Sequence, residues 1–218
     1  MLADPRLPRE QRLQVAKAAV HSVLFLRTGC RARPAAGQSS MIYSAAMQPI
    51  RAVHEAARRA DPDQPRTADA EVRRELAVPH PEAEVIADRF RLLARLSRCR
   101  SRALLGLLRA PGSQAWRGDA LRDLGVLKAM LPGKLEEFPL PTVEPAKWEQ
   151  FWMSWPAQWK QLIKQFLAKV AADEAAFLRA CTAQGIRPVA GHMWPGLLYY
   201  KSRKQKEWAP RKNIQSVA

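Results

Sequence analysis

Residues 156–184, PAQWKQLIKQFLAKVAADEAAFLRACTAQ, carry the strongest structural signal in the chain. Their apolar side chains recur every three or four residues, which is the period of an α-helix. Pro156 suits the first turn of a helix, where its missing N–H needs no partner, and Gly185 suits the position just after the last turn. We therefore predict a helix over 156–184 whose apolar face is buried, in particular Leu162, Ile163, Phe166, Val170 and Phe177.

The rest of the chain repeats this helical pattern. Apolar spacing and capping residues predict further helices over about 9–27, 41–59, 67–76, 81–109 and 119–131. We expect a loop over 29–40, a cap at Thr67, and a kink or break at Pro49. Alternating β-branched stretches and hairpin turns are missing from the sequence. The fold class predicted is all-α, an irregular helical bundle.

Prolines divide this helical pattern into parts. Pro132, Pro139, Pro141 and Pro145 each lack a backbone donor and restrict φ, so we expect an extended linker over 132–145. After residue 185 the periodicity is lost, and a basic, largely extended tail is expected. The predicted parts are an Arg-rich helical region at 1–131, the linker at 132–145, a Trp-rich amphipathic helix at 146–185 and a basic aromatic tail at 186–218.

The charge of the chain indicates an anionic partner. Its 218 residues include 36 Lys and Arg against 20 Asp and Glu, a formal net charge of +16. The excess is spread along the length, with 20 basic and 11 acidic residues in 1–109 and 16 and 9 in 110–218. At 47% hydrophobic the chain can bury a core. Globular chains this basic bind nucleic acid, anionic membrane surfaces or acidic proteins.

An arginine rail is the most informative of the basic features. Arg91, Arg95, Arg98, Arg102 and Arg109 follow one side of the helix predicted over 81–109, opposite Ile86, Leu93, Leu96, Leu104 and Leu107. Like charges four residues apart weaken an isolated helix, and a polyanion would remove that cost. Acidic partners, which are typical of a solvated helix face, are missing after Asp88. A solvated face and contact with an acidic protein remain the alternatives to phosphate binding.

The C-terminal segment combines cations with aromatic side chains. Such a mixture suits RNA, because cations pair with phosphates and rings stack on unpaired bases. A disordered basic tail is the alternative interpretation. The candidate RNA-binding residues of the tail are Tyr199, Tyr200, Lys201, Arg203, Lys204, Lys206, Trp208, Arg211 and Lys212.

Four tryptophans, Trp148, Trp152, Trp155 and Trp159, also have helical spacing. A helix continuous across Pro156 would place all four on one stripe. Three interpretations stay open for this stripe: packing in the core, docking of a protein partner, and a membrane-interface belt beside Lys160 and Lys164.

Features of an enzyme or a metal site are scarce in the sequence. His54 begins HEAAR, which lacks the second histidine of a zinc HExxH motif, and the phosphate-binding glycine loops and the serine-hydrolase elbow are missing. The three cysteines are isolated, which disfavours a disulfide framework. No apolar run reaches the length of a transmembrane helix. We therefore expect no catalytic residue, no metal, no cofactor and no small-molecule substrate.

These features together lead to one functional hypothesis and two alternatives. A helical body, a Pro-rich linker and a basic aromatic tail resemble in composition the accessory proteins of organelle ribosomes, although no motif carries this resemblance. We expect a non-enzymatic structural subunit of a mitochondrial or other organelle ribosome, located in the matrix and contacting rRNA and neighbouring subunits. The first alternative is an accessory subunit of an inner-membrane respiratory or ATP-synthase complex, which would contact the membrane surface. The second is a protein that binds an acidic filament such as the microtubule.

Overall fold

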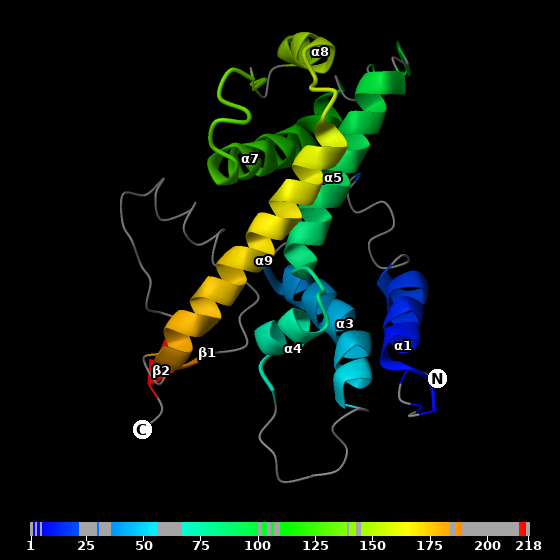
Figure 1. Cartoon of the computed structure of the whole chain (residues 1–218). Coiled ribbons are helices and arrows are strands. Elements are labelled where there is room, and N and C mark those ends of the chain that lie inside the picture. The colour runs from blue at the N-terminus through cyan, green and yellow to red at the C-terminus, as the bar shows by residue number, and fades with distance from the viewer. Residues whose placement is uncertain are drawn as a thin grey trace. The chain divides into compact units, whose positions relative to one another are not determined.

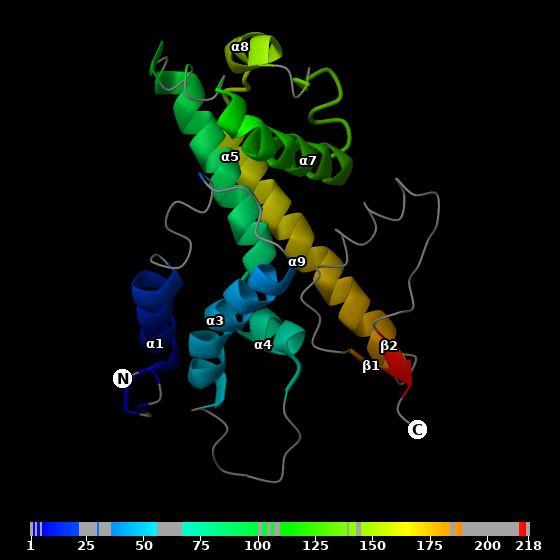
Figure 2. The ribbon, with the colours of Figure 1, turned by 180° about the vertical axis from the view of Figure 1, so that it is seen from behind.

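The described part of the chain is mostly helical (Figures 1 and 2). The computed structural model describes residues 2, 4, 6–21, 30, 36–55, 67–99, 102, 103, 106, 110–138, 140–142, 145–183, 186–188 and 214–216. The all-α prediction is confirmed at this level. The strands found among these residues are one short antiparallel pair, β1 (Ile186–Pro188) with β2 (Ile214–Ser216).

The helical elements follow in chain order. They are α1 (Arg9–Val15), the π-helical segment η1 (Ala16–His21), α3 (Ala36–Glu55), α4 (Asp69–Glu75), α5 (Pro81–Cys99), the 3-10 turn η3 (Pro111–Ser113), α7 (Gln114–Met130), α8 (Pro145–Met153) and α9 (Trp159–Ala183).

The chain forms two compact units. Unit 1 comprises Met1–Leu26, Ala35–Glu84 and Val170–Ala218, and unit 2 comprises Arg27–Pro34 and Val85–Lys169. Unit 1 is therefore built from three separate stretches of sequence, whereas nearly all of unit 2 is one continuous stretch. The four-part division expected from the sequence stays a prediction.

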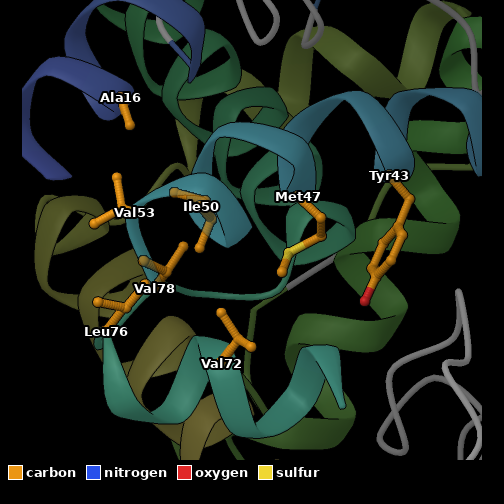
Figure 3. Close-up of a cluster of buried hydrophobic side chains, with 8 residues drawn as sticks. All are labelled: Ala16, Tyr43, Met47, Ile50, Val53, Val72, Leu76 and Val78. Carbon is orange, nitrogen blue, oxygen red and sulfur yellow. The ribbon is translucent and has the colours of Figure 1, made fainter. Parts of the chain in front are cut away.

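The hydrophobic core of unit 1 lies between α3, α4 and η1. Figure 3 shows Met47, Ile50 and Val53 of α3 facing Val72 of α4 and the residues that follow it. Each fully buried aliphatic side chain stabilises the fold by about 1.5–3 kcal/mol. The buried cluster comprises Ala16, Tyr43, Met47, Ile50, Val53, Val72, Leu76 and Val78.

Packing in this core explains why α3 continues through Pro49. Pro49 cannot donate a backbone hydrogen bond, and we expected a kink or break there. The helix α3 has 20 residues with Pro49 inside it, so the expected break does not occur. The neighbouring Met47 and Ile50 are fully buried, so their apolar packing offsets the missing hydrogen bond. The loop predicted over 29–40 extends too far, because residues 36–40 belong to α3, which begins at Ala36.

The helix α4 begins at Asp69 without a side-chain cap from Thr67, contrary to our expectation. Ala68 occupies the N-cap position, and its N–H donates to the Glu71 carboxylate over 3.3 Å. This bond is one half of the reciprocal capping arrangement, in which an acidic side chain of the first turn reaches back to the cap.

Unit 2 packs α7, α8 and parts of α5 and α9 around aromatic side chains. Both views show α5 beside the first half of α9 (Figures 1 and 2). Phe90 of α5 lies against Trp159 and Phe166 of α9, with ring centroids 5.6 and 5.8 Å apart. The predicted burial of Leu162, Ile163, Phe166 and Val170 is confirmed, and the Phe177 side chain lies outside the described part.

The Pro-rich segment 132–145 is not helical before Pro145, where α8 begins. Its first half is folded into turns rather than extended. Gly133 adopts a φ of +76°, and the N–H groups of Lys134 and Phe138 donate to the carbonyls of Leu131 and Leu135. The Leu135 side chain is buried, which holds this segment against the rest of unit 2. Pro139 and residues 143 and 144 lie outside the described residues.

Candidate nucleic-acid interface

The described arginines of the rail are solvent-exposed. Arg91, Arg95 and Arg98 lie on the exposed face of α5, and Arg102 is exposed just beyond it. The opposite face is buried at Ile86 and Leu93, as predicted. The helix predicted over 81–109 is described as α5 only to Cys99, and Arg109, Leu104 and Leu107 lie outside the described residues. Within α5 the rail therefore spans about 10 Å from Arg91 to Arg98, at about 1.5 Å per residue.

Two of these side chains are anchored to their own helix. The Nε–H of Arg95 donates to the carbonyl of Arg91 over 3.3 Å, and that of Arg98 donates to the carbonyl of Ala94 over 3.1 Å. A guanidinium has five N–H donors, so each side chain keeps the four donors of its terminal amino groups. Within the described part of the chain, these terminal groups of Arg95 and Arg98 have no carboxylate partner.

The sequence explains why Arg95, Arg98 and Arg102 have no acidic neighbour along the helix. The chain holds no Asp or Glu between Asp88 and Asp119, although it holds eight arginines over that interval. No acidic side chain three or four residues away can therefore neutralise the arginines of the rail that follow Arg91. Arginine stays protonated at every physiological pH, so this face is permanently cationic.

Other arginines of the same interval are buried and belong to the fold. Arg89 of α5 forms an ion pair with Asp123 of α7, its Nη1 lying 2.9 Å from Oδ2, and both side chains are almost completely buried. Arg89 lies on the buried side of α5, together with Ile86 and Leu93. Nothing local identified Asp123 as its partner, although a lone aspartate inside the apolar stretch ALRDLGVL was an available signal.

Among the described residues, the excess of exposed basic over exposed acidic side chains is concentrated in unit 2. In unit 1 several arginines are buried or paired with carboxylates, and exposed acidic side chains accompany the exposed basic ones. In residues 85–169 the exposed acidic residues described are Glu136 and Glu137. The exposed basic residues described there are Arg91, Arg95, Arg98, Arg102, Arg122, Lys134, Lys147, Lys160, Lys164 and Lys169.

The tryptophan stripe is not a continuous helix, which corrects our expectation. The helix α8 ends at Met153 and α9 begins at Trp159. The Ser154 N–H and hydroxyl both bond back to the carbonyls of Gln150 and Phe151, which closes α8. Pro156 then lacks the N–H needed to carry the helix on.

The tryptophans instead form part of an aromatic cluster. Trp159 lies against Trp155, with ring centroids 4.1 Å apart, and Trp148 lies against Phe151 at 5.4 Å. The Trp148 indole N–H donates to the Thr142 carbonyl over 3.0 Å. Trp148 and Trp159 are buried in unit 2 and Trp155 is half-buried, so core packing accounts for these three. The side chain of Trp152 is not among those described.

Unit 1 contains a second set of buried charges, which sequence reasoning missed. Arg73 forms an ion pair with Glu174 and donates a hydrogen bond to the Tyr43 hydroxyl. Burial raises the pKa of Tyr43 to about 12, against a weaker lowering by the Arg73 charge. Burial lowers the pKa of Arg73, but Tyr43 and Glu174 together raise it above its ordinary value. The phenol is therefore neutral and the guanidinium charged at neutral pH.

Paired carboxylates extend this set along α4. Asp69 accepts from the Arg51 Nε over 2.6 Å, and Glu75 lies 2.9 Å from the His54 Nε2. These contacts neutralise the buried charges of unit 1 inside its own fold. They leave this unit with no row of uncompensated cations comparable with the rail among its described residues.

The tail residues proposed for RNA binding lie outside the described residues. This applies to Tyr199, Tyr200, Lys201, Arg203, Lys204, Lys206, Trp208, Arg211 and Lys212. Their role stays a prediction.

The described residues contain no group of three or more His, Cys, Asp and Glu side chains that could hold a metal ion. Their helices include none with the length and apolar character needed to cross a membrane. No family model matches the chain, and no curated protein or solved structure matches it either.

Proposed function

We propose that this protein is a non-enzymatic structural subunit of a large ribonucleoprotein assembly. Exposed Arg95 and Arg98 of α5, with Arg102 after them, carry the proposal, because the sequence holds no acidic residue between Asp88 and Asp119 that could neutralise them from a neighbouring helical position. Guanidinium groups bind phosphates through two parallel hydrogen bonds, which makes a phosphate backbone a fitting counterpart.

The assembly proposed is an organelle ribosome, in the mitochondrial or a comparable matrix. The subunit would contact rRNA phosphates through the rail, and the tail would add cations and aromatic rings. Neighbouring ribosomal proteins would contact the remaining surface. No small-molecule substrate or cofactor enters this proposal.

Salt dependence of RNA binding tests the role of the rail. Each neutralised phosphate releases counterions, so affinity should fall with salt with a log–log slope of about −0.7 to −0.9 per contact. Replacing Arg95, Arg98 and Arg102 together by Gln should flatten this slope by about two to three. The fold should survive, because these side chains are exposed.

A matched control removes the same charge from unit 1. Lys17, Arg74 and Arg179 are exposed there, and their combined replacement by Gln should leave most of the slope intact. Equal losses in both triple variants would mean that net charge, not the rail, drives binding. A rail variant that matches the parent in affinity and slope would remove the rail from the proposal.

Fractionation tests the proposed assembly. The protein should sediment with organelle ribosomes and stay with them in moderate salt after detergent treatment. Release by detergent alone would favour the inner-membrane alternative, and co-sedimentation with microtubules would favour the filament alternative.

A further inference from the structure

The aromatic rings of unit 2 pack against one another. Trp155 contacts Phe138, Phe151 and Trp159, and Trp148 contacts Trp116. Every aromatic side chain described between residues 85 and 169 is buried or half-buried and takes part in such a ring contact: Phe90, Trp116, Phe138, Trp148, Phe151, Trp155, Trp159 and Phe166.

This arrangement separates the cations of unit 2 from its aromatic rings. Proteins that hold unpaired bases combine a basic groove with exposed rings on which the bases stack. In the described part of unit 2 the exposed side chains supply the cations, while the rings supply the core. The described surface of unit 2 is therefore equipped to contact phosphates, and its described side chains include no exposed aromatic platform of the kind that single-stranded bases require.

The geometry of the rail fits the phosphate backbone of an RNA duplex rather than its major groove. An exposed α-helix cannot enter the deep, narrow major groove of an A-form duplex, whose bases are inaccessible to side chains. The described row of guanidinium groups on α5, from Arg91 to Arg98, is about 10 Å long at about 1.5 Å per residue and can follow successive phosphates of one strand of a duplex. The intrahelical bonds of Arg95 and Arg98 hold both side chains along this row before a ligand arrives.

From these observations we infer that the rail binds the sugar–phosphate backbone of double-stranded RNA without recognising its bases. The inference rests on the proposed function and names the form of RNA that the rail contacts. Single-stranded RNA is left to the aromatic tail, where Tyr199 and Trp208 supply rings. The two surfaces should therefore respond to different ligands.

Binding of the full-length chain to three labelled RNAs tests the inference. Two are blunt duplexes of about 24 base pairs with unrelated sequences, and the third is a single strand of uridines of equal length. The two duplexes should bind with affinities within about twofold of each other. Replacing Arg91, Arg95 and Arg98 by Gln should weaken duplex binding by about tenfold or more, and single-strand binding clearly less.

A second variant supplies the opposite pattern. Replacing Tyr199 and Trp208 by Ala should weaken single-strand binding by about tenfold and duplex binding little, because stacking acts on unpaired bases. Circular dichroism of each variant should match the parent. Equal losses of duplex and single-strand binding in the arginine variant would overturn the inference, as would a tenfold preference between the two duplexes. Failure of the parent to bind any of the three RNAs would overturn the proposed function as well.

Discussion

Arg73 of α4 and Glu174 of α9 form a buried ion pair although 101 residues separate them in the sequence. Removing one partner leaves the other charge buried without compensation, which costs about 3–5 kcal/mol. Glu174→Ala should therefore lower the free energy of unfolding by that amount in urea denaturation. The double replacement of Arg73 by Met and Glu174 by Leu should recover most of the loss.

Arg179→Ala is the control for this prediction. Arg179 is exposed on the same helix, so its replacement should change stability by less than about 0.5 kcal/mol. A loss below about 1 kcal/mol for Glu174→Ala would show that the pair contributes little.

Burial of Tyr43 predicts a loss of stability in alkaline solution. Its pKa is about 12 in the folded state, against an ordinary value of 10.0 for tyrosine. A pKa raised on folding means that this contribution is complete below pH 10 and is lost as the pH rises from about 10 to 12. The chain holds three tyrosines, so subtracting the tyrosinate absorbance of Tyr43→Phe from that of the parent isolates this phenol. A midpoint near 10 would contradict its burial.

Arg89 and Arg95 should respond in opposite ways to replacement by Gln. Arg89 is buried and paired with Asp123, so Arg89→Gln leaves a buried carboxylate uncompensated and should cost about 3–5 kcal/mol. Arg95 is exposed, so Arg95→Gln should change stability by less than about 0.5 kcal/mol. Denaturation of the two variants under identical conditions checks both values. Equal losses of stability in Arg89→Gln and Arg95→Gln would contradict the difference in burial between the two side chains.

Phe166→Ala should destabilise unit 2. Its side chain is fully buried and meets the Phe90 ring edge-on. Truncating a buried Phe costs about 3–5 kcal/mol, because apolar contacts are lost and a cavity remains. Gln161→Ala, at an exposed position of the same helix, is the control. Unchanged stability in Phe166→Ala would place this face in solvent or against a partner.

The helices were predictable because their signal is local. The apolar period identified α9 and its buried face from Leu162 to Val170, and the same period identified α5 and its exposed arginines. Helix ends were harder to place. The four tryptophans have the same spacing in one helix as in two, and their spacing alone does not show that Ser154 closes α8 and that Pro156 prevents the helix from continuing.

The buried charges were not predictable for a different reason. Sequence rules place arginine and glutamate at the surface, since their burial is costly without a partner. The partner of Arg73 is 101 residues away, and the partner of Arg89 lies on another helix. No periodicity connects such pairs. The candidate interface could be predicted because it needs only one helix, whereas the charges that stabilise the units need several.

The three-part construction of unit 1 has a consequence for biosynthesis. Arg73 leaves the ribosome long before Glu174, and at about 5–20 residues per second the interval is about 5–20 s. During that time the guanidinium has no buried carboxylate to meet, so it must remain hydrated. Residues 85–169 can meanwhile assemble among themselves. The apolar cluster between α3, α4 and η1 needs no residue beyond Val78 and can pack early, whereas the buried charge of Arg73 is expected to be among the last groups of unit 1 to reach its native contacts.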